Sequence, residues 1–160
     1  MAYPERMKEG TFLVTHADDA SAVLRDVADG QVHTLADNPG VETGAVVEAA
    51  IEPEPPMEVA WQVADLRRQR TIPVEESPEP PTQQAHDIAA GQPVGEVTRQ
   101  ERAGDGELHV LTVSPADTED AVADVLDDEE TVARAARLGV ARVEVRAAET
   151  GLVSVRYLPD

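Results

Sequence analysis

The sequence predicts an α+β protein, in which a small antiparallel β-barrel or five-stranded meander precedes a β-α-α-β-β unit. Three observations lead to this prediction. Short segments of alternating apolar residues, separated by turn residues, fill residues 10–75, which is typical of a sheet of hairpins. An acidic, proline-rich stretch interrupts the pattern at residues 75–81. Two segments of helical periodicity and a hairpin then follow between residues 114 and 159.

These changes in composition divide the chain into four expected segments. Residues 1–9 form a flexible lead-in, in which Met7 could be the natural start, and residues 10–75 form the barrel-like domain. Residues 76–106 form a proline-rich connector with a short helix, and residues 107–160 form the α+β unit. Each folded part is small for a stable core, so it stays open whether the two pack as one body.

Five short strands are expected in the barrel-like domain, because period-two alternation recurs there between turn signals. Asp29 and Gly30 form a strong hairpin signal between the second and third strands. In the first strand, Phe12, Val14 and His16 are expected on one face. The expected strands cover residues 11–16, 21–27, 31–35, 45–51 and 57–66.

The expected helices begin and end at recognisable signals. A short helix is expected over residues 82–90, and a second begins at residues 114–117, where the Ser114 hydroxyl precedes a proline and an acid. Asp127 and Asp128 can cap the next helix.

Charge is ordered along that last helix. Glu129 and Glu130 occupy its first turn, and Glu130 lies four residues before Arg134, the favourable direction for an ion pair. Gly139 ends it, since glycine adopts the left-handed conformation without steric cost.

The net charge of −19 is the strongest global signal in the sequence. Lys8 is the only lysine, so arginine supplies nearly all the basic charge. Such self-repulsion destabilises a protein in dilute buffer, but at molar salt the screening length falls to about 3 Å. The composition therefore predicts a protein of a salt-accumulating halophile, and in that setting acidity does not exclude a nucleic-acid partner.

Cysteine is absent, which excludes disulfides, thiolate catalysis and cysteine metal sites. No stretch approaches the roughly 20 apolar residues of a membrane-spanning helix, and the N-terminus lacks the hydrophobic core of a signal peptide. We expect a soluble, cytoplasmic protein without a membrane partner.

No catalytic, cofactor or metal site is expected. His16, His33 and His109 fall on expected strands and His86 on the short helix, but no two histidines have a metal-ligand spacing. The sequence does not reveal whether the three strand histidines converge. The acidic pairs lie in turns and first helical turns, where solvation and capping account for them.

A basic cluster is the one candidate site for nucleic acid. Arg67, Arg68 and Arg70 could follow a phosphate backbone, with Trp61 on the same segment as a stacking platform. Alternatively, the arginines protect a strand edge or form ion pairs with nearby carboxylates. Trp61 alternates with Val63 and its apolar neighbours, which favours a core position.

A second basic set falls on the C-terminal hairpin. Arg142, Arg146 and Arg156 lie there, and Arg142 and Arg146 share a face with Glu144. Local pairing with that glutamate is the expected arrangement.

Two resemblances add to this interpretation. Residues 42–48 (ETGAVVE) resemble the start of a strand in oligonucleotide-binding-type and related small RNA-binding barrels. The whole chain from Met7 resembles an uncharacterised haloarchaeal family, on the residues 8–16, 31–35, 55–59 and 128–160. That resemblance implies a salt-adapted cytosolic protein of unassigned function, and it supplies no catalytic residues.

Three functions stay open at this point. The first is a non-catalytic binding or adaptor protein, with RNA as a candidate partner through the barrel face and the arginine cluster. The second is a protein–protein scaffold or self-associating module, as a monomer or a homodimer. The third, an enzyme with an unrecognised histidine and acid, ranks last because no nucleophile–base pair, metal spacing or cofactor loop is present.

Overall fold

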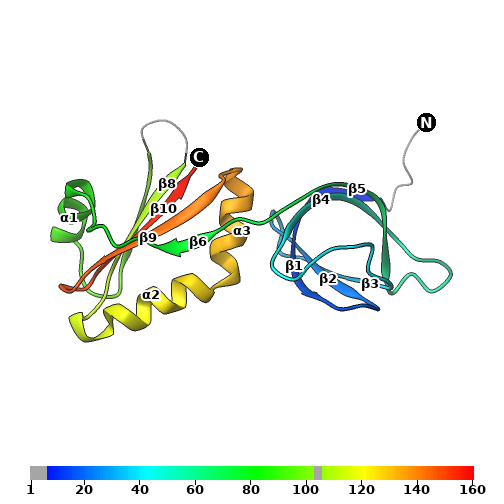
Figure 1. Cartoon of the computed structure of the whole chain (residues 1–160), viewed down its shortest axis with the longest axis horizontal. Helices are drawn as coiled ribbons and strands as arrows, with labels where there is room; N and C mark the ends of the chain where they lie inside the picture. Colours follow the sequence, from blue (N-terminus) through cyan, green and yellow to red (C-terminus); the bar gives the residue numbers. More distant parts are fainter. Residues whose placement is uncertain (1–6, 103–105) are drawn as a thin grey trace. The chain divides into compact units, whose positions relative to one another are not determined.

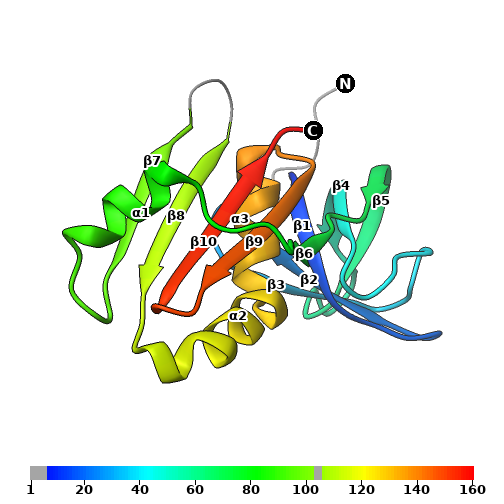
Figure 2. The ribbon, with the colours of Figure 1, turned by 60° about the vertical axis from the view of Figure 1, so that its left-hand side comes forward.

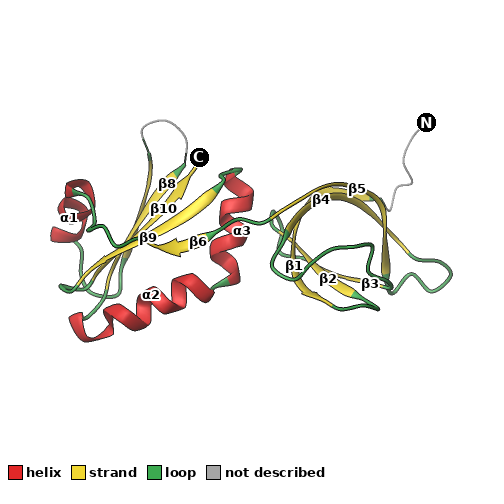
Figure 3. Cartoon of the chain, viewed as in Figure 1, coloured by secondary structure: helices red, strands yellow, loops and turns green. Residues whose placement is uncertain are grey.

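The chain folds into two compact units, Met1–Ile72 and Pro73–Asp160. A computed structural model describes residues 7–102 and 106–160. It is a mixed α+β structure with two sheets, and the α-helices of the described residues all belong to the second unit (Figure 3). The expected lead-in falls largely on residues 1–6, outside the described residues, and the first strand already begins at Lys8.

Five strands of the first unit form a closed ring in the order β1-β2-β3-β5-β4 (Figure 1). We call it the N-terminal ring. Strand β4 lies between β1 and β5 and pairs with both along most of its length. The strands are β1 (Lys8–Ala17), β2 (Ala22–Asp26), β3 (Val32–Leu35), β4 (Val46–Pro53) and β5 (Trp61–Arg70).

The ring closes through one parallel pair, Leu35↔Trp61 of β3 and β5, whereas its other pairs are antiparallel. Five is an odd number, so strands that alternate in direction around a closed ring must include one parallel pair. The expectation of a wholly antiparallel arrangement is therefore wrong at this pair. The meander alternative is also wrong, because β3 is followed around the ring by β5 and not by β4.

The interior of the ring is filled by small aliphatic side chains around one phenylalanine. Phe12, Leu24, Leu35 and Ile51 are almost completely buried there. His16 was expected on the same face as Phe12, but it is exposed. The register of β1 against β2 shifts between Val14 and His16, and this one-residue irregularity turns the His16 side chain outward.

The last ring strand, β5, begins later than the alternation predicted and runs on to Arg70. Residues 57–60 were expected in it, but they belong to a turn that joins β4 to β5. In this turn the Glu58 amide donates to the Glu54 carbonyl at 2.9 Å, and the Glu54 amide donates to the Ala60 carbonyl at 2.8 Å. Met57 and Val59 are consequently 75% and 80% exposed. We call residues 54–60 the β4–β5 turn.

The second unit is built on a five-stranded sheet in the order β6-β9-β10-β8-β7 (Figure 2). Its central strands β9 and β10 form a hairpin whose register runs from Leu152↔Ala148 to Leu158↔Arg142. The strands are β6 (Val74–Glu76), β7 (Val97–Glu101), β8 (Glu107–Thr112), β9 (Arg142–Ala148) and β10 (Leu152–Leu158).

The boundary between the units differs from the expected one at residues 75/76. Strand β6 pairs in parallel with β9, from Val74↔Val143 to Glu76↔Val145, so it is part of the second sheet. The expected connector also supplies β7, which pairs with β8. Polar, half-exposed edge strands such as β7 show little hydrophobic alternation, so composition alone makes them resemble linkers.

The helices begin and end mostly where the sequence indicates. Thr82 caps α1 (Gln83–Ala90), and Asp128 caps α3 (Glu129–Leu138), where its Oδ1 accepts from the Glu130 amide at 2.9 Å. Gly139 ends α3 with a φ of 71°. Ser114 does not cap through its hydroxyl: its carbonyl accepts from the Asp117 amide, and a 3₁₀ turn (Pro115–Asp117) leads into α2 (Thr118–Asp127).

Helices cover both faces of the second sheet (Figures 1 and 2). Helix α1 packs on one face, where Leu108, Val110 and Leu152 form an apolar cluster with Ala85. Helices α2 and α3 contact β9 on the opposite face, and α2 also contacts β6 and β10. We call these the α1 face and the α2/α3 face.

Candidate functional site

Two arginines of the cluster on β5, Arg67 and Arg68, lie in ion pairs. Arg67 donates from Nη2 to Glu9 Oε1 at 2.7 Å and from Nε to Asp65 Oδ2 at 3.0 Å. Arg68 Nη1 lies 3.8 Å from Glu48 Oε2. These side chains are 40–62% exposed, so the pairs are open to solvent.

Trp61 is not part of that cluster. It begins β5, whereas Arg67 lies six residues later, which is about 20 Å along an extended strand. Trp61 packs partly buried against the ring core, and its ring meets that of His33 edge-on at 4.6 Å between centroids. The geometry therefore matches the core position and separates Trp61 from the arginines.

The only lysine of the chain holds a polar cluster in the N-terminal ring. Lys8 Nζ lies 3.1 Å from Asp26 Oδ2, 3.0 Å from Asp29 Oδ2 and 2.9 Å from His33 Nε2. Burial works to lower the pKa of Lys8, but hydrogen bonds from its ammonium to Asp29 and Asp26 outweigh it and raise the pKa. Burial, and then the charge of Lys8, lower the pKa of His33. The cluster satisfies its own charges and joins β1 to the β2–β3 hairpin.

The histidines do not assemble a metal site in the part of the chain that the structure describes, where no group of three potential ligands occurs. His16 lies 3.3 Å from Asp18, His33 lies against Lys8, and His109 belongs to the second unit.

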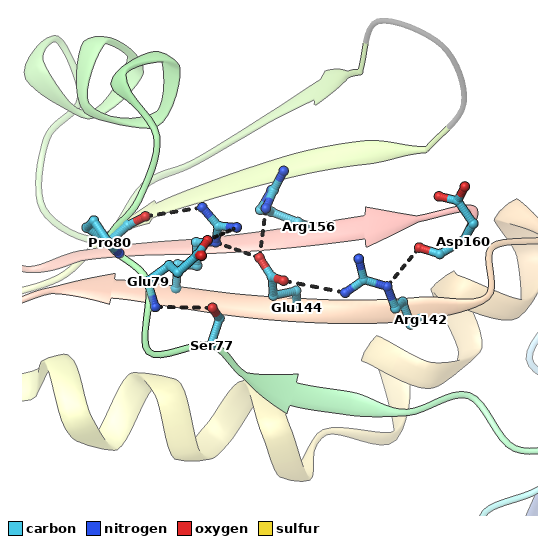
Figure 4. A network of polar contacts seen from close by, with 8 residues as sticks. Ser77, Glu79, Pro80, Arg142, Glu144, Arg156 and Asp160 are labelled. Carbon is cyan, nitrogen blue, oxygen red and sulfur yellow. Dashed lines mark hydrogen bonds and ion pairs between the residues drawn. The ribbon is translucent and has the colours of Figure 1, made fainter.

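Three arginines converge on one glutamate on the α1 face (Figure 4). Glu144 Oε1 accepts from Arg146 Nε at 2.5 Å and from Arg156 Nη1 at 2.7 Å, and Arg142 Nη1 lies 3.4 Å from Oε2. Arg146 also reaches Glu79 at 2.9 Å. The expected pairing of Arg142 and Arg146 with Glu144 is confirmed, and we call these residues the Glu144 cluster.

The Glu144 cluster is largely shielded from water. The side chains of Glu144, Arg146 and Arg156 are only 16%, 14% and 19% exposed. Burial works to raise the pKa of Glu144, but hydrogen bonds from Arg146 and Arg156 outweigh it and lower the pKa below its usual value. Each cation is held in place by a carboxylate or a carbonyl, which indicates that the cluster joins strands and leaves no charge free for a ligand.

A cavity of about 200 Å³ opens on the α2/α3 face between β7, β8, β10 and the start of α3. Helices α2 and α3 pack mainly on β9 and β10, so they leave the neighbouring strands β7 and β8 less covered on this face. Apolar side chains from strands and from α2 form part of the wall: Val97, Leu111, Val125 and Val155. Polar groups from β7, β8, β10 and α3 form the rest. We call it the β7–α3 cavity.

A carboxylate–imidazole pair lies beside this cavity, with His109 buried and Glu107 half-buried. Glu107 Oε1 accepts from His109 Nε2 at 2.8 Å and from Arg134 Nη2 and Nε at 2.7 and 2.9 Å. Burial works against ionisation of Glu107, but its hydrogen bonds to His109 and Arg134 lower its pKa. Burial also lowers the pKa of His109, which favours its neutral form. Its Nε2 then carries the proton that Glu107 accepts, and Nδ1 is an acceptor.

Tyr157 lies next to this pair, with its ring centroid 4.8 Å from that of His109. Burial raises the pKa of Tyr157 to about 12, so its hydroxyl stays protonated at neutral pH. Among the described residues, no buried side-chain nitrogen or oxygen lacks a hydrogen-bond partner. The Tyr157 hydroxyl and His109 Nδ1 make no hydrogen bond there, so both must reach the surface of the cavity that these residues line.

Sequence reasoning missed this arrangement. It paired Arg134 with Glu130, four residues earlier, but Glu130 is bonded to Arg137 at 2.6 Å and Arg134 reaches Glu107 on β8. The two residues are 27 positions apart, so the spacing of neighbouring residues cannot predict their contact. The only available signal was the pattern Glu107-Leu108-His109, which places a carboxylate and an imidazole on the same face of a strand.

Comparison with known proteins places the chain in a family. Residues 8–147 match the model of a family of unknown function, DUF5812, and the chain belongs to this family. No curated protein matches the chain, and no solved structure matches it. Within the described residues, none of the helices is both long and apolar enough to span a bilayer.

Proposed function

We propose that this protein is a non-catalytic binding protein whose N-terminal ring associates with single-stranded nucleic acid, RNA above all. One observation carries the proposal: the strand order β1-β2-β3-β5-β4, closed by a parallel β3–β5 pair. This is the strand order of the oligonucleotide-binding fold, a five-stranded Greek-key barrel. In that fold the β2–β3 face and the loops after β1 and β4 hold the oligonucleotide.

The corresponding surface of this chain combines exposed apolar and polar groups. Val32 on β3 is 62% exposed, and Met57 and Val59 on the β4–β5 turn are more exposed still. Thr34 on β3 and His16 near the end of β1 are also exposed. Apolar contact to bases matters here because high salt weakens the purely electrostatic part of binding.

The arginines of β5 offer a second set of contacts. Exposed ion pairs contribute only about 0–1 kcal/mol each, so a phosphate can replace the carboxylate partners of Arg67 and Arg68 at little cost. Arg70 is half-buried at the end of the same strand.

The charge of the chain supports a salt-rich setting for this function. With 32 acidic residues against 13 basic ones, and lysine nearly absent, we place the protein in the cytosol of a salt-accumulating cell. Binding assays therefore belong at molar salt, where the chain's self-repulsion is screened.

The test is fluorescence anisotropy with a labelled single-stranded oligouridylate across a range of KCl concentrations. The variants are Arg67→Gln/Arg68→Gln/Arg70→Gln and Met57→Ser/Val59→Ser. If each arginine meets one phosphate, the triple variant lowers the slope of log K against log salt by about 2, since each single-strand phosphate contact contributes about 0.7. The Met57/Val59 variant weakens binding at every salt concentration with the slope unchanged.

Arg137→Gln, on α3 of the second unit, is the matched control and should bind as the wild type does. Absence of binding at every salt concentration would refute the proposal. So would wild-type affinity and slope in both ring variants.

A protein–protein scaffold is the second candidate, and the observation that favours it is the exposed edge of the second sheet. Among the described residues β7 pairs only with β8, and Val94 and Val97 beside this edge are 62% and 47% exposed. Such an edge can pair with another strand. Light scattering at molar salt tests it: a dimer that Val97→Lys dissociates supports the candidate, and a monomer without a co-purifying protein contradicts it.

A further inference from the structure

We propose that the β7–α3 cavity binds a small organic molecule with an apolar body, an oxyanion group and a hydrogen-bond donor such as a hydroxyl. This inference concerns the second unit and does not depend on the proposed role of the N-terminal ring.

One arginine at this cavity has neither a hydrogen bond nor an ion pair, although the chain carries a net charge of −19. Among the described residues, Arg99 is the only arginine without a hydrogen bond or ion pair. It lies on β7 and lines the cavity. In a chain so rich in carboxylates, an arginine left without one is available to an anion from solution.

The carboxylates at or beside the cavity, by contrast, already accept hydrogen bonds. Glu107 accepts from His109 and from Arg134, and Glu130 accepts from Arg137 at 2.6 Å. Asp128 accepts from a backbone amide as the N-cap of α3. An anion that binds Arg99 therefore does not compete with a carboxylate already paired to it.

Arg134 adds a second donor to this site. It uses Nε and Nη2 for Glu107, and its Nη1 makes no hydrogen bond in the described part of the chain. Its side chain is 27% exposed, so the guanidinium is held by Glu107 and still faces open space. A fixed, paired arginine presents its remaining N–H group without further loss of side-chain entropy.

His109 and Tyr157 define the rest of the ligand. Because Nδ1 of neutral His109 is an acceptor, the group it meets must donate a hydrogen bond, which an oxyanion cannot do. The Tyr157 hydroxyl can donate to the oxyanion. Val97, Leu111 and Val125 face the remainder of the space, so the body of the ligand is apolar. Mandelate, with a carboxylate, a neighbouring hydroxyl and a phenyl ring, carries all three features.

The test follows the imidazole Cε1–H signal of His109 by NMR at molar KCl and neutral pH, with His109→Gln to assign it. Three probes are compared: mandelate, phenylacetate without the hydroxyl, and benzylamine with a cation in place of the carboxylate. We expect a saturable shift with mandelate, weaker binding of phenylacetate and no binding of benzylamine.

Variants separate the site from a general effect of charge. Arg99→Gln should weaken mandelate binding at least tenfold, since a hydrogen bond to a charged group is lost. Tyr157→Phe should weaken it by a smaller factor. Arg142→Gln, an arginine on the α1 face of the same sheet, is the control and should leave the affinity unchanged.

Three outcomes would overturn the proposal. They are the absence of a saturable shift with mandelate, equal binding of benzylamine, and wild-type affinity in Arg99→Gln. Circular dichroism of each variant shows whether it is folded, and Arg99, exposed on an edge strand, is a position where substitution should preserve the fold.

Discussion

Replacing Glu144 by glutamine is expected to destabilise the C-terminal unit by about 3 kcal/mol. The substitution removes the only carboxylate shared by Arg142, Arg146 and Arg156, whose nearest contacts to it are 3.4, 2.5 and 2.7 Å. Breaking a buried ion pair by removing one partner costs about 3–5 kcal/mol, because the other charge is left unpaired. Exposures of 14–19% for Glu144, Arg146 and Arg156 place this cluster at the lower end of that range.

The two units can be followed separately in the same sample. The α-helices of the described residues lie in the second unit, so far-UV circular dichroism reports on it, while Trp61 is the only tryptophan and reports on the N-terminal ring. For a domain of this size, 1 kcal/mol shifts the midpoint by about 4–8 °C. We therefore expect the helix transition to fall by about 12–24 °C at molar KCl, with the fluorescence transition of Trp61 unchanged.

Glu149→Gln is the matched control, because Glu149 is exposed in the β9–β10 turn. An exposed substitution of this kind changes stability by at most about 0.5 kcal/mol. A helix transition for Glu144→Gln that coincides with that of Glu149→Gln would show that the cluster contributes nothing. Removing Arg156 in the same chain should recover part of the loss, since it relieves an unpaired cation.

Three further predictions concern pH, backbone geometry and salt. The pKa values of Glu107 and Glu144 are lowered on folding, so their contribution to stability is present above the ordinary value of 4.5 and is lost as the pH falls through the folded values. The midpoint of the helix transition should therefore drop in acid. The double variant Glu107→Gln/Glu144→Gln should make that midpoint less dependent on pH. A Cβ on Gly151, whose φ is 99°, would lie 2.0 Å from the Val113 carbonyl oxygen. Thermal unfolding should therefore show that Gly151→Ala lowers the free energy of unfolding by more than about 2 kcal/mol. Gly91→Ala is the control: a Cβ there meets no atom within 4 Å, so the stability should hardly change. Dialysis into low salt should unfold the chain cooperatively by circular dichroism, and full structure in dilute buffer would contradict salt adaptation.

Local signals predicted most of the elements. The N-cap Asp128 and the stop at Gly139 lie where the sequence placed them, because each acts through hydrogen bonds to its own helix end. Alternation also located the strands, but it failed at His16, where β1 is irregular, and at residues 57–60, which form a turn. An irregularity or a turn leaves the composition of a segment unchanged, so periodicity cannot detect it.

The candidate sites were predicted unevenly, for a related reason. The pairing of Arg142 and Arg146 with Glu144 could be predicted because residues two apart on one strand share a face. The β7–α3 cavity could not, since it needs Arg99 from β7, His109 from β8 and Arg134 from α3 together.

The sequence by itself determined the mixed α+β class, most helix ends, most strand faces and the charge of this protein. These features depend on a few neighbouring residues or on composition, so they can be predicted without knowledge of the tertiary structure. The tertiary structure alone decided that the first five strands close through a parallel pair, that Lys8 meets His33, and that Arg134 bonds to Glu107 and not to Glu130. Each of these contacts joins residues more than 20 positions apart. Their geometry follows from how whole strands and helices pack, which no local pattern encodes.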